Sequence, residues 1–347
     1  MVLEHAAASL RGAAILSVSL LVTGCIGPFA RPEPPAPVPA DPPRADAPTP
    51  GRGQPMPAVD RDPVAHPDFG APMAGPPMTG APVPLRSGAV LPRRRIVAFY
   101  GNPASERMGI LGELPPDQML AQLDQEVAAW ERADPDTPVQ PALHMMATVA
   151  AGDPGPDSLY RTRMSNQRIA EVKEWADRRD ALLFLDIQPG RSTVSAELPR
   201  LHEWLARPDV HLALDPEWNM GPRGLPGRTI GSMTAAEINF AIRFLADLVE
   251  KHDLPPKILV VHRFTRPMVR GAKDLVTDPR VQLVLNMDGW GPPAQKLNTY
   301  RSVVAPDASQ FTGFKLFYKN DLRDGSRMMR PDEILALRPI PFYIQYQ

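Results

Sequence analysis

The chain has 347 residues, of which 44 are proline, and its formal net charge is -1 at pH 7. A charge this close to zero gives no electrostatic reason to expect nucleic acid or another polyanion as a partner, and we predict none. The sequence has no glycine-rich phosphate loop and no zinc-type spacing of cysteines and histidines, which excludes the common nucleotide-binding and zinc-finger classes.

The first 25 residues predict export. The apolar stretch Gly12 to Val22 is too short to span a bilayer comfortably and suits a secretion signal. The letters LVTGC that end at Cys25 resemble a bacterial lipobox, in which the signal is removed and the cysteine carries lipid. We therefore predict a signal peptide over 1–24 and lipidation of Cys25, the sole cysteine, on the extracellular or periplasmic face of a membrane. An uncleaved membrane anchor with the same topology is the alternative.

Residues 25–92 predict a disordered tether. Of the prolines, 20 fall between Pro28 and Pro92, a span whose only aromatic residues are Phe29 and Phe69. Such a segment has too little apolar surface to offset the entropy of ordering it, and proline favours extended conformations without internal hydrogen bonds. The folded domain is accordingly predicted over 93–347.

Short apolar runs alternate with longer amphipathic ones in this domain. Strands are predicted at 94–101, 139–150, 181–188, 210–217, 257–264, 281–290, 311–320 and 341–347. Helices are predicted at 115–134, 164–180, 194–208, 234–253, 268–275 and 330–339. Ser195 is expected to cap the third helix, and Thr234 with Glu237 forms a capping box on the fourth. Eight such units in about 255 residues predict one closed (β/α)8 barrel, with an open doubly wound sheet as the alternative.

Polar residues end almost every predicted strand. In a parallel barrel the carboxyl ends of the strands share one mouth, where the sites of such folds lie. Asp186 and Asp215 stand out because each falls inside an apolar run, where an unpaired carboxylate is costly to bury. Trp218 and Trp290 each follow a strand-end acid, and flat aromatic faces suit sugar rings. The remaining predicted site residues are Tyr100, Asn102, His144, Gln188, Glu217, His262, Asn286, Asp288, Lys315, Tyr318 and Gln345.

Asp215 and Glu217 share one face of the fourth strand if its alternation continues to the end. An acid-x-Glu pair at this place resembles the chitinases and the barrel-type bacterial muramidases. The resemblance implies that Glu217 is the general acid and Asp215 its helper, with Asp186, Asp288 or the substrate itself as the second group. The chain differs from both families in Pro216 between the acids, and from the chitinases in having Ala213 where they carry a further acid.

The leading hypothesis is an exported, lipid-anchored glycoside hydrolase that acts on a cell-envelope or extracellular polysaccharide and needs no metal or cofactor. A surface lipoprotein that binds carbohydrate on a degenerate barrel without catalysis is the second hypothesis. A third is a metal-dependent hydrolase or lyase that uses His144, Asp186, Glu217 and His262, residues of suitable type without a diagnostic spacing.

Overall fold

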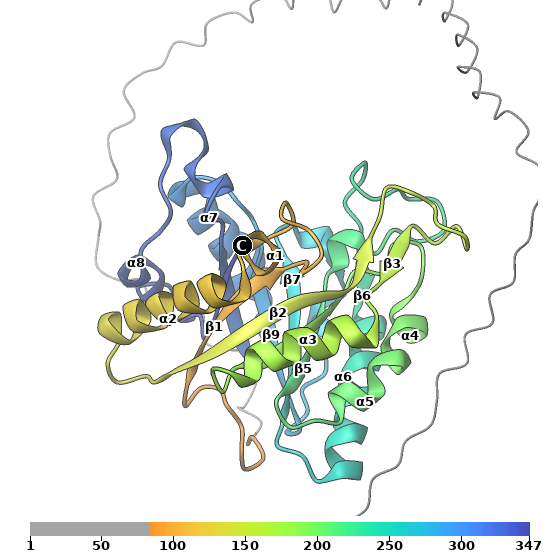
Figure 1. Cartoon of the computed structure of the whole chain (residues 1–347), viewed down its shortest axis with the longest axis horizontal. Helices are drawn as coiled ribbons and strands as arrows, with labels where there is room; N and C mark the ends of the chain where they lie inside the picture. Colours follow the sequence, from red (N-terminus) through yellow and green to blue (C-terminus); the bar gives the residue numbers. More distant parts are fainter. Residues whose placement is uncertain (1–83) are drawn as a thin grey trace, which may run out of the picture. The chain divides into compact units, whose positions relative to one another are not determined.

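Eight parallel strands close into a barrel in the computed structural model, which describes residues 84–347 (Figure 1). The predicted signal peptide, Cys25 and most of the predicted tether lie outside the described residues. Each barrel strand pairs with the next along the chain, and β11 pairs with β1 to complete the ring. The barrel strands are β1 (Arg95–Gly101), β2 (Val139–Ala150), β4 (Leu182–Ile187), β5 (Val210–Leu214), β7 (Lys257–Arg263), β9 (Val281–Met287), β10 (Phe311–Leu316) and β11 (Tyr343–Tyr346). The predicted barrel and all eight of its strands are confirmed.

Helices cover the outside of the barrel. Figure 1 shows α2 and α3 lying across the strands, and both contact β2. The helices are α1 (Ile110–Glu113), α2 (Pro116–Ala133), α3 (Asn166–Asp177), α4 (Val194–Glu197), α5 (His202–Leu205), α6 (Ala235–His252), α7 (Pro293–Thr299) and α8 (Pro331–Leu335). Three short strands lie outside the ring: β3 (Arg161–Arg163) pairs with the end of β2, and β6 (Met233–Thr234) pairs with β8 (Val269–Arg270). Within residues 84–347, no helix combines the length and hydropathy needed to cross a membrane.

Capping residues and prolines determine where several of the helices begin and end. The capping box of α6 is present, because the Thr234 side chain accepts from the Glu237 N–H and the Glu237 carboxylate accepts in return. The single helix predicted at 194–208 is wrong, since a 3-10 turn around Pro199 separates α4 from α5. Its cap is Thr193 rather than Ser195, and the helix predicted at 268–275 is reduced to 3-10 turns.

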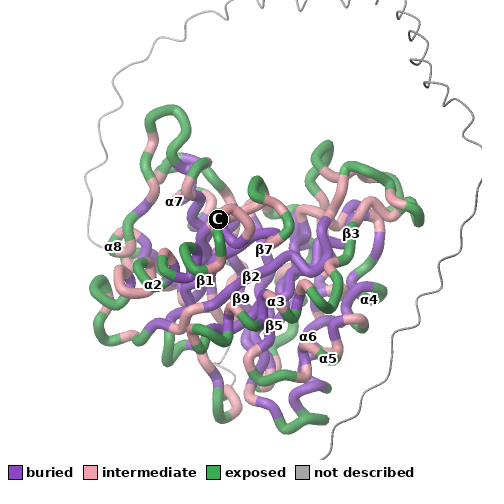
Figure 2. Tube along the Cα trace, in the orientation of Figure 1, coloured by how far each residue is buried: buried purple, intermediate pink, exposed green. Residues whose placement is uncertain are grey.

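Two apolar layers hold the barrel. One lies between the strands and the helices, and the other fills the barrel interior near the amino ends of the strands. Figure 2 shows the contrast between the buried strands and the exposed outer sides of the helices. Leu91 is fully buried in the interior layer, where the Gln282 amide donates to the Leu91 carbonyl at 2.7 Å and accepts from the Val90 N–H at 3.0 Å. This segment closes the amino-terminal end, so the interior opens at the carboxyl ends of the strands.

Glu197 at the end of α4 is completely buried and binds three donors. Its carboxylate accepts from Arg161 at 2.9 Å, from Arg163 at 2.7 Å and from the Ser192 hydroxyl at 2.6 Å. Burial alone would raise the pKa of Glu197, but Arg163, Ser192 and Arg161 outweigh it and lower that pKa to about 2. Glu197 thereby ties β3, and with it the end of β2, to the outer helices.

Replacing Glu197 with Ala should lower the free energy of unfolding by about 3 kcal/mol, because it leaves Arg161 without its buried partner. The carboxylate stabilises the fold above its unfolded pKa of about 4.5, so the difference between parent and variant should shrink as the pH falls from about 5 toward about 2. Urea unfolding at several pH values measures this. Asp332→Asn, at a fully exposed ion pair, should leave the free energy of unfolding nearly unchanged. A similar loss for both variants would contradict the argument.

Candidate active site

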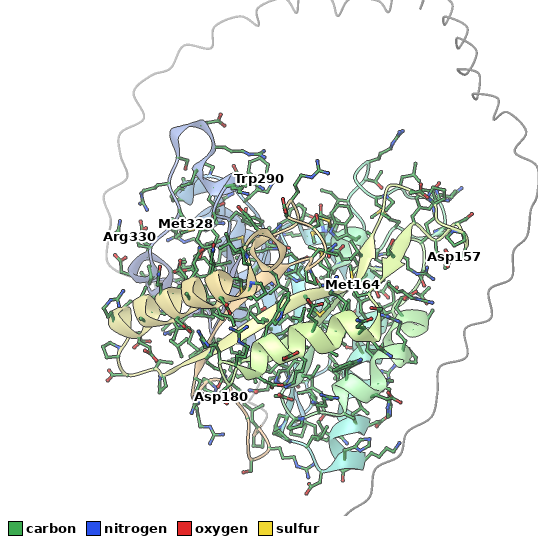
Figure 3. All side chains as sticks on the ribbon, viewed as in Figure 1. Asp157, Met164, Asp180, Trp290, Met328 and Arg330 are labelled. Atoms are coloured by element: carbon green, nitrogen blue, oxygen red, sulfur yellow. The ribbon has the colours of Figure 1, made fainter. Side chains whose placement is uncertain are left out.

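A pocket of about 610 Å³ lies at the carboxyl ends of the strands. Its walls combine carboxyl groups with aromatic and cationic side chains, and Figure 3 shows Trp290 at the edge of the domain near α7. Trp290 is 47% exposed, whereas Gln188, Asp215, Asp288 and Lys315 in the polar lining are buried. The predicted site residues that line this pocket are Tyr100, Gln188, Asp215, Glu217, Trp218, Asp288, Trp290 and Lys315.

Asp215 and Glu217 both line the pocket, but a turn rather than strand alternation brings them there. Strand β5 ends at Leu214, and Pro216 to Trp218 form a 3-10 turn. The Asp215 carboxylate accepts a hydrogen bond from the Glu217 N–H at 3.2 Å, which caps this turn. The main-chain position of Glu217 is therefore set by the acid two residues before it.

The carboxyl groups of the pocket differ in charge. Burial, followed by the charge of Asp288, raises the pKa of Glu217 to about 7. Burial also raises the pKa of Asp215 well above its usual range. For Asp288 burial acts in the same direction, but Lys315 and then His262 outweigh it and lower its pKa to about 2. Near neutral pH the pocket thus holds an ionised carboxylate, Asp288, and a carboxyl, Glu217, that is still partly protonated.

Asp288 receives its two positive partners from neighbouring strands. The Lys315 ammonium on β10 lies 2.9 Å from one of its oxygens, and the His262 Nδ1 on β7 lies 3.0 Å from the other. Lys315 also lies 3.9 Å from the centre of the Tyr100 ring, where a cation is attracted to the aromatic face. Gln188 donates to the Tyr100 hydroxyl at 3.2 Å and to Asp215 at 3.4 Å. The floor of the pocket is therefore a connected polar network.

A second group of predicted site residues lies beneath this floor. His144, Asp186, His262, Asn286 and Gln345 are fully buried, and none of them lines the pocket. Burial lowers the pKa of His144 to about 4 against the opposing effect of Asp186. For His262 the carboxylates of Asp288 and Asp186 outweigh burial and raise the pKa. The structure therefore separates Asp186 from the pocket acids by one layer of side chains.

Two predicted residues lie elsewhere. The Tyr318 hydroxyl donates to Glu126 of α2 at 2.8 Å, so this side chain packs outside the barrel. Phe317 lines the pocket in its place, which strict alternation from the inward-facing Lys315 would have predicted. Asn102 is buried and accepts from the Ala104 N–H at 2.9 Å, which shapes the loop after β1. Further lining residues that were not predicted come from loops, among them Arg107, Met108, Phe264 and Thr265.

Comparisons with known proteins add little to this geometry. No protein-family model matches the sequence, and no curated protein matches it. Among solved structures, the chain is similar to a hyperthermophilic endo-beta-1,4-glucanase in complex with substrate, with a TM-score of 0.30 and 9% sequence identity. The likeness covers 60% of this chain and 77% of that chain. A similarity this low carries no argument about function.

Replacing Asp288 with Asn should lower the pKa of Glu217. The change removes the negative charge that opposes ionisation of Glu217 and leaves the positive charge of Lys315, which favours it. A carbon-13 NMR titration of the glutamate carboxyls measures the pKa, with the Glu217 signal assigned by its loss in Glu217→Gln. Asp278→Asn, which removes an acid from the loop before β9, should leave the Glu217 titration unchanged. An unaltered pKa in Asp288→Asn would show that burial alone raises it.

Proposed function

We propose that this protein is a glycoside hydrolase in which Glu217 is the general acid and Asp288 the ionised partner. The observation that carries the proposal is the contrast between these two carboxyls, one with a pKa of about 7 and one of about 2, in the same pocket. Glycosidases require such a pair, because the leaving oxygen needs a proton while the sugar develops positive charge.

The chemistry follows from the charges in the pocket. The Glu217 carboxyl donates its proton to the glycosidic oxygen as the bond to the sugar breaks. A water molecule then bonds to the anomeric carbon and returns a proton to Glu217. The negative charge of Asp288 stabilises the positive charge that develops on the sugar ring. Lys315 and His262 keep Asp288 ionised and fixed in place. Asp215 acts as a positioning residue, since its carboxylate holds the turn that carries Glu217.

A polysaccharide is the proposed substrate class. Trp218 and Trp290 line the pocket, and their faces can stack on the apolar faces of sugar rings. The polar floor offers hydrogen-bonding groups for hydroxyls, from Gln188 and Tyr100 among others. Together with the predicted export of the chain, this favours a polymer of the cell envelope or of the surroundings.

Glu217→Gln should lower kcat on a hydrolysed polysaccharide by about 10²- to 10⁴-fold and leave binding intact, because the amide keeps the shape but has no acidic proton. For the parent, kcat/KM should fall as the pH rises through about 7, where Glu217 loses its proton. Reducing-sugar release measures kcat and kcat/KM, and isothermal titration calorimetry measures binding. Glu203→Gln on the outer helix α5 is the matched control and should retain full activity.

Full activity in Glu217→Gln would rule out this mechanism. Tight glycan binding by the parent without turnover across a panel of polysaccharides would instead support the non-catalytic carbohydrate-binding hypothesis.

We also propose that lipid on Cys25 holds the protein to a membrane, on the basis of the lipobox-like sequence before it. The parent should then sediment with membranes and be released by detergent, whereas Cys25→Ser should lose the lipid label in cells fed a radioactive fatty acid. A labelled Cys25→Ser variant would contradict lipidation at this residue. An unlabelled parent that still sediments with membranes would favour the uncleaved anchor.

A further inference from the structure

Three buried side chains under the pocket floor point polar atoms at one another without bonding. The Nε2 atoms of His144 and His262 each lie 3.5 Å from Oδ2 of Asp186. Among residues 84–347, no group completes a hydrogen bond to either Nε2 atom or to either oxygen of Asp186. Leaving a buried polar group unpaired costs about 1 to 3 kcal/mol, and more for a charged group. Several such atoms facing one point therefore indicate a missing partner.

The spacing of these atoms decides between a shared proton and a shared ion. Direct N–H to oxygen hydrogen bonds span about 2.7 to 3.2 Å, so both 3.5 Å separations are too long for a proton shared between the rings and Asp186. Ligands on one tetrahedral zinc ion, each about 2.0 to 2.1 Å from it, lie roughly 3.3 Å apart. The three ligand atoms all fall within 4.8 Å of one another. The two nitrogen-to-oxygen separations are therefore closer to the spacing of ligands on one ion than to that of a good hydrogen bond.

We propose that His144 Nε2, the Asp186 carboxylate and His262 Nε2 form a binding site for one divalent transition-metal ion of the zinc class. Two imidazoles with one carboxylate form a ligand set that suits zinc, and three protein ligands leave one position for another group. The leading hypothesis from the sequence includes no metal, and His144, Asp186 and His262 appear as ligands only in the third hypothesis. The site goes beyond the proposed hydrolase mechanism, which uses none of the three as a reacting group.

The surrounding contacts orient both imidazoles for this role. Nδ1 of His262 lies 3.0 Å from Asp288 and donates a hydrogen bond to it, so Nε2 is the nitrogen that would give up its proton to bind a metal. Nδ1 of His144 lies 2.6 Å from the Tyr343 hydroxyl, which can accept a hydrogen bond in the same way. The Gln345 amide nitrogen also lies 2.8 Å from this nitrogen, and turning over the amides of Gln345 and Asn286 together would present the Gln345 oxygen there instead. Carboxylate or hydroxyl partners on the far nitrogen are typical of metal-binding histidines.

Tyr100 connects the site to the pocket. Its ring centre lies 5.0 Å from that of His144 and 5.8 Å from that of His262, and the same side chain lines the pocket. An ion that enters from the pocket would therefore pass Tyr100. Once bound, it would fix the ring of His262 and, through the far nitrogen, the carboxylate of Asp288.

The test measures metal content rather than hydrolysis, so its outcome does not depend on the proposed function. The full chain, without a polyhistidine tag, is equilibrated with zinc and then freed of loosely bound metal, and bound zinc is counted by mass spectrometry. The parent should hold one zinc ion more than Asp186→Asn or His144→Gln, and each variant should bind zinc at least about 100-fold more weakly. His211→Gln is the matched control, because this buried interior histidine bonds the Ile258 N–H and lies outside the cluster.

Equal zinc contents in the parent and in folded Asp186→Asn would overturn the proposal. Should the variants fail to fold, the unaltered protein still decides the question in two measurements. Cobalt should give the visible absorption of a tetrahedral site with nitrogen and oxygen ligands, and zinc should raise Tm as a ligand of the folded state does. Absence of both effects in the parent would equally overturn it.

Discussion

Closure of the sheet by the pairing of β1 with β2 and β11 is the constraint on which the rest of the molecule depends. A closed ring gives every strand one inward face, and the carboxyl ends of all eight strands meet at one mouth. Groups far apart in the chain, such as Tyr100 and Lys315, become neighbours only through this closure. The apolar layer at the opposite end supplies the burial that holds the ring shut.

The balance of charges near the carboxyl ends of the barrel strands follows from the same closure. Asp186 and Asp288 are both buried, and isolated carboxylates there would be costly. Lys315 and His262 supply positive charge from other strands, so the negative charge of these carboxylates is neutralised by side chains of neighbouring strands. Asp288 stays ionised as a result, and its negative charge raises the pKa of Glu217. A proton-donating acid and a stable anion thus arise from one network.

Much of this was predictable because the local signals are strong. All eight strands could be predicted, because each apolar run is bounded by turn residues. The helix α6 could be predicted because its capping box is formed by residues close together in the sequence. The break at Pro199 and the inward Phe317 were readable in the sequence, from the proline itself and from the alternation that starts at Lys315, but the predictions did not include them. The depth of Asp186 was not predictable, because a strand-end acid lies in or below a pocket according to side chains from other strands. The buried triple contact of Glu197 likewise joins residues 34 and 36 positions apart along the chain.

The segment at Leu91 that closes the amino-terminal end also sets how the domain is presented to its surroundings. Arg86, a few residues earlier, pairs with Glu250 and Asp253 at the last turn of α6, on that same end. Residues 86–91 therefore lie on the side of the domain away from the opening. The walls of the pocket are built without this segment, so a long polymer could cross the opening without meeting it.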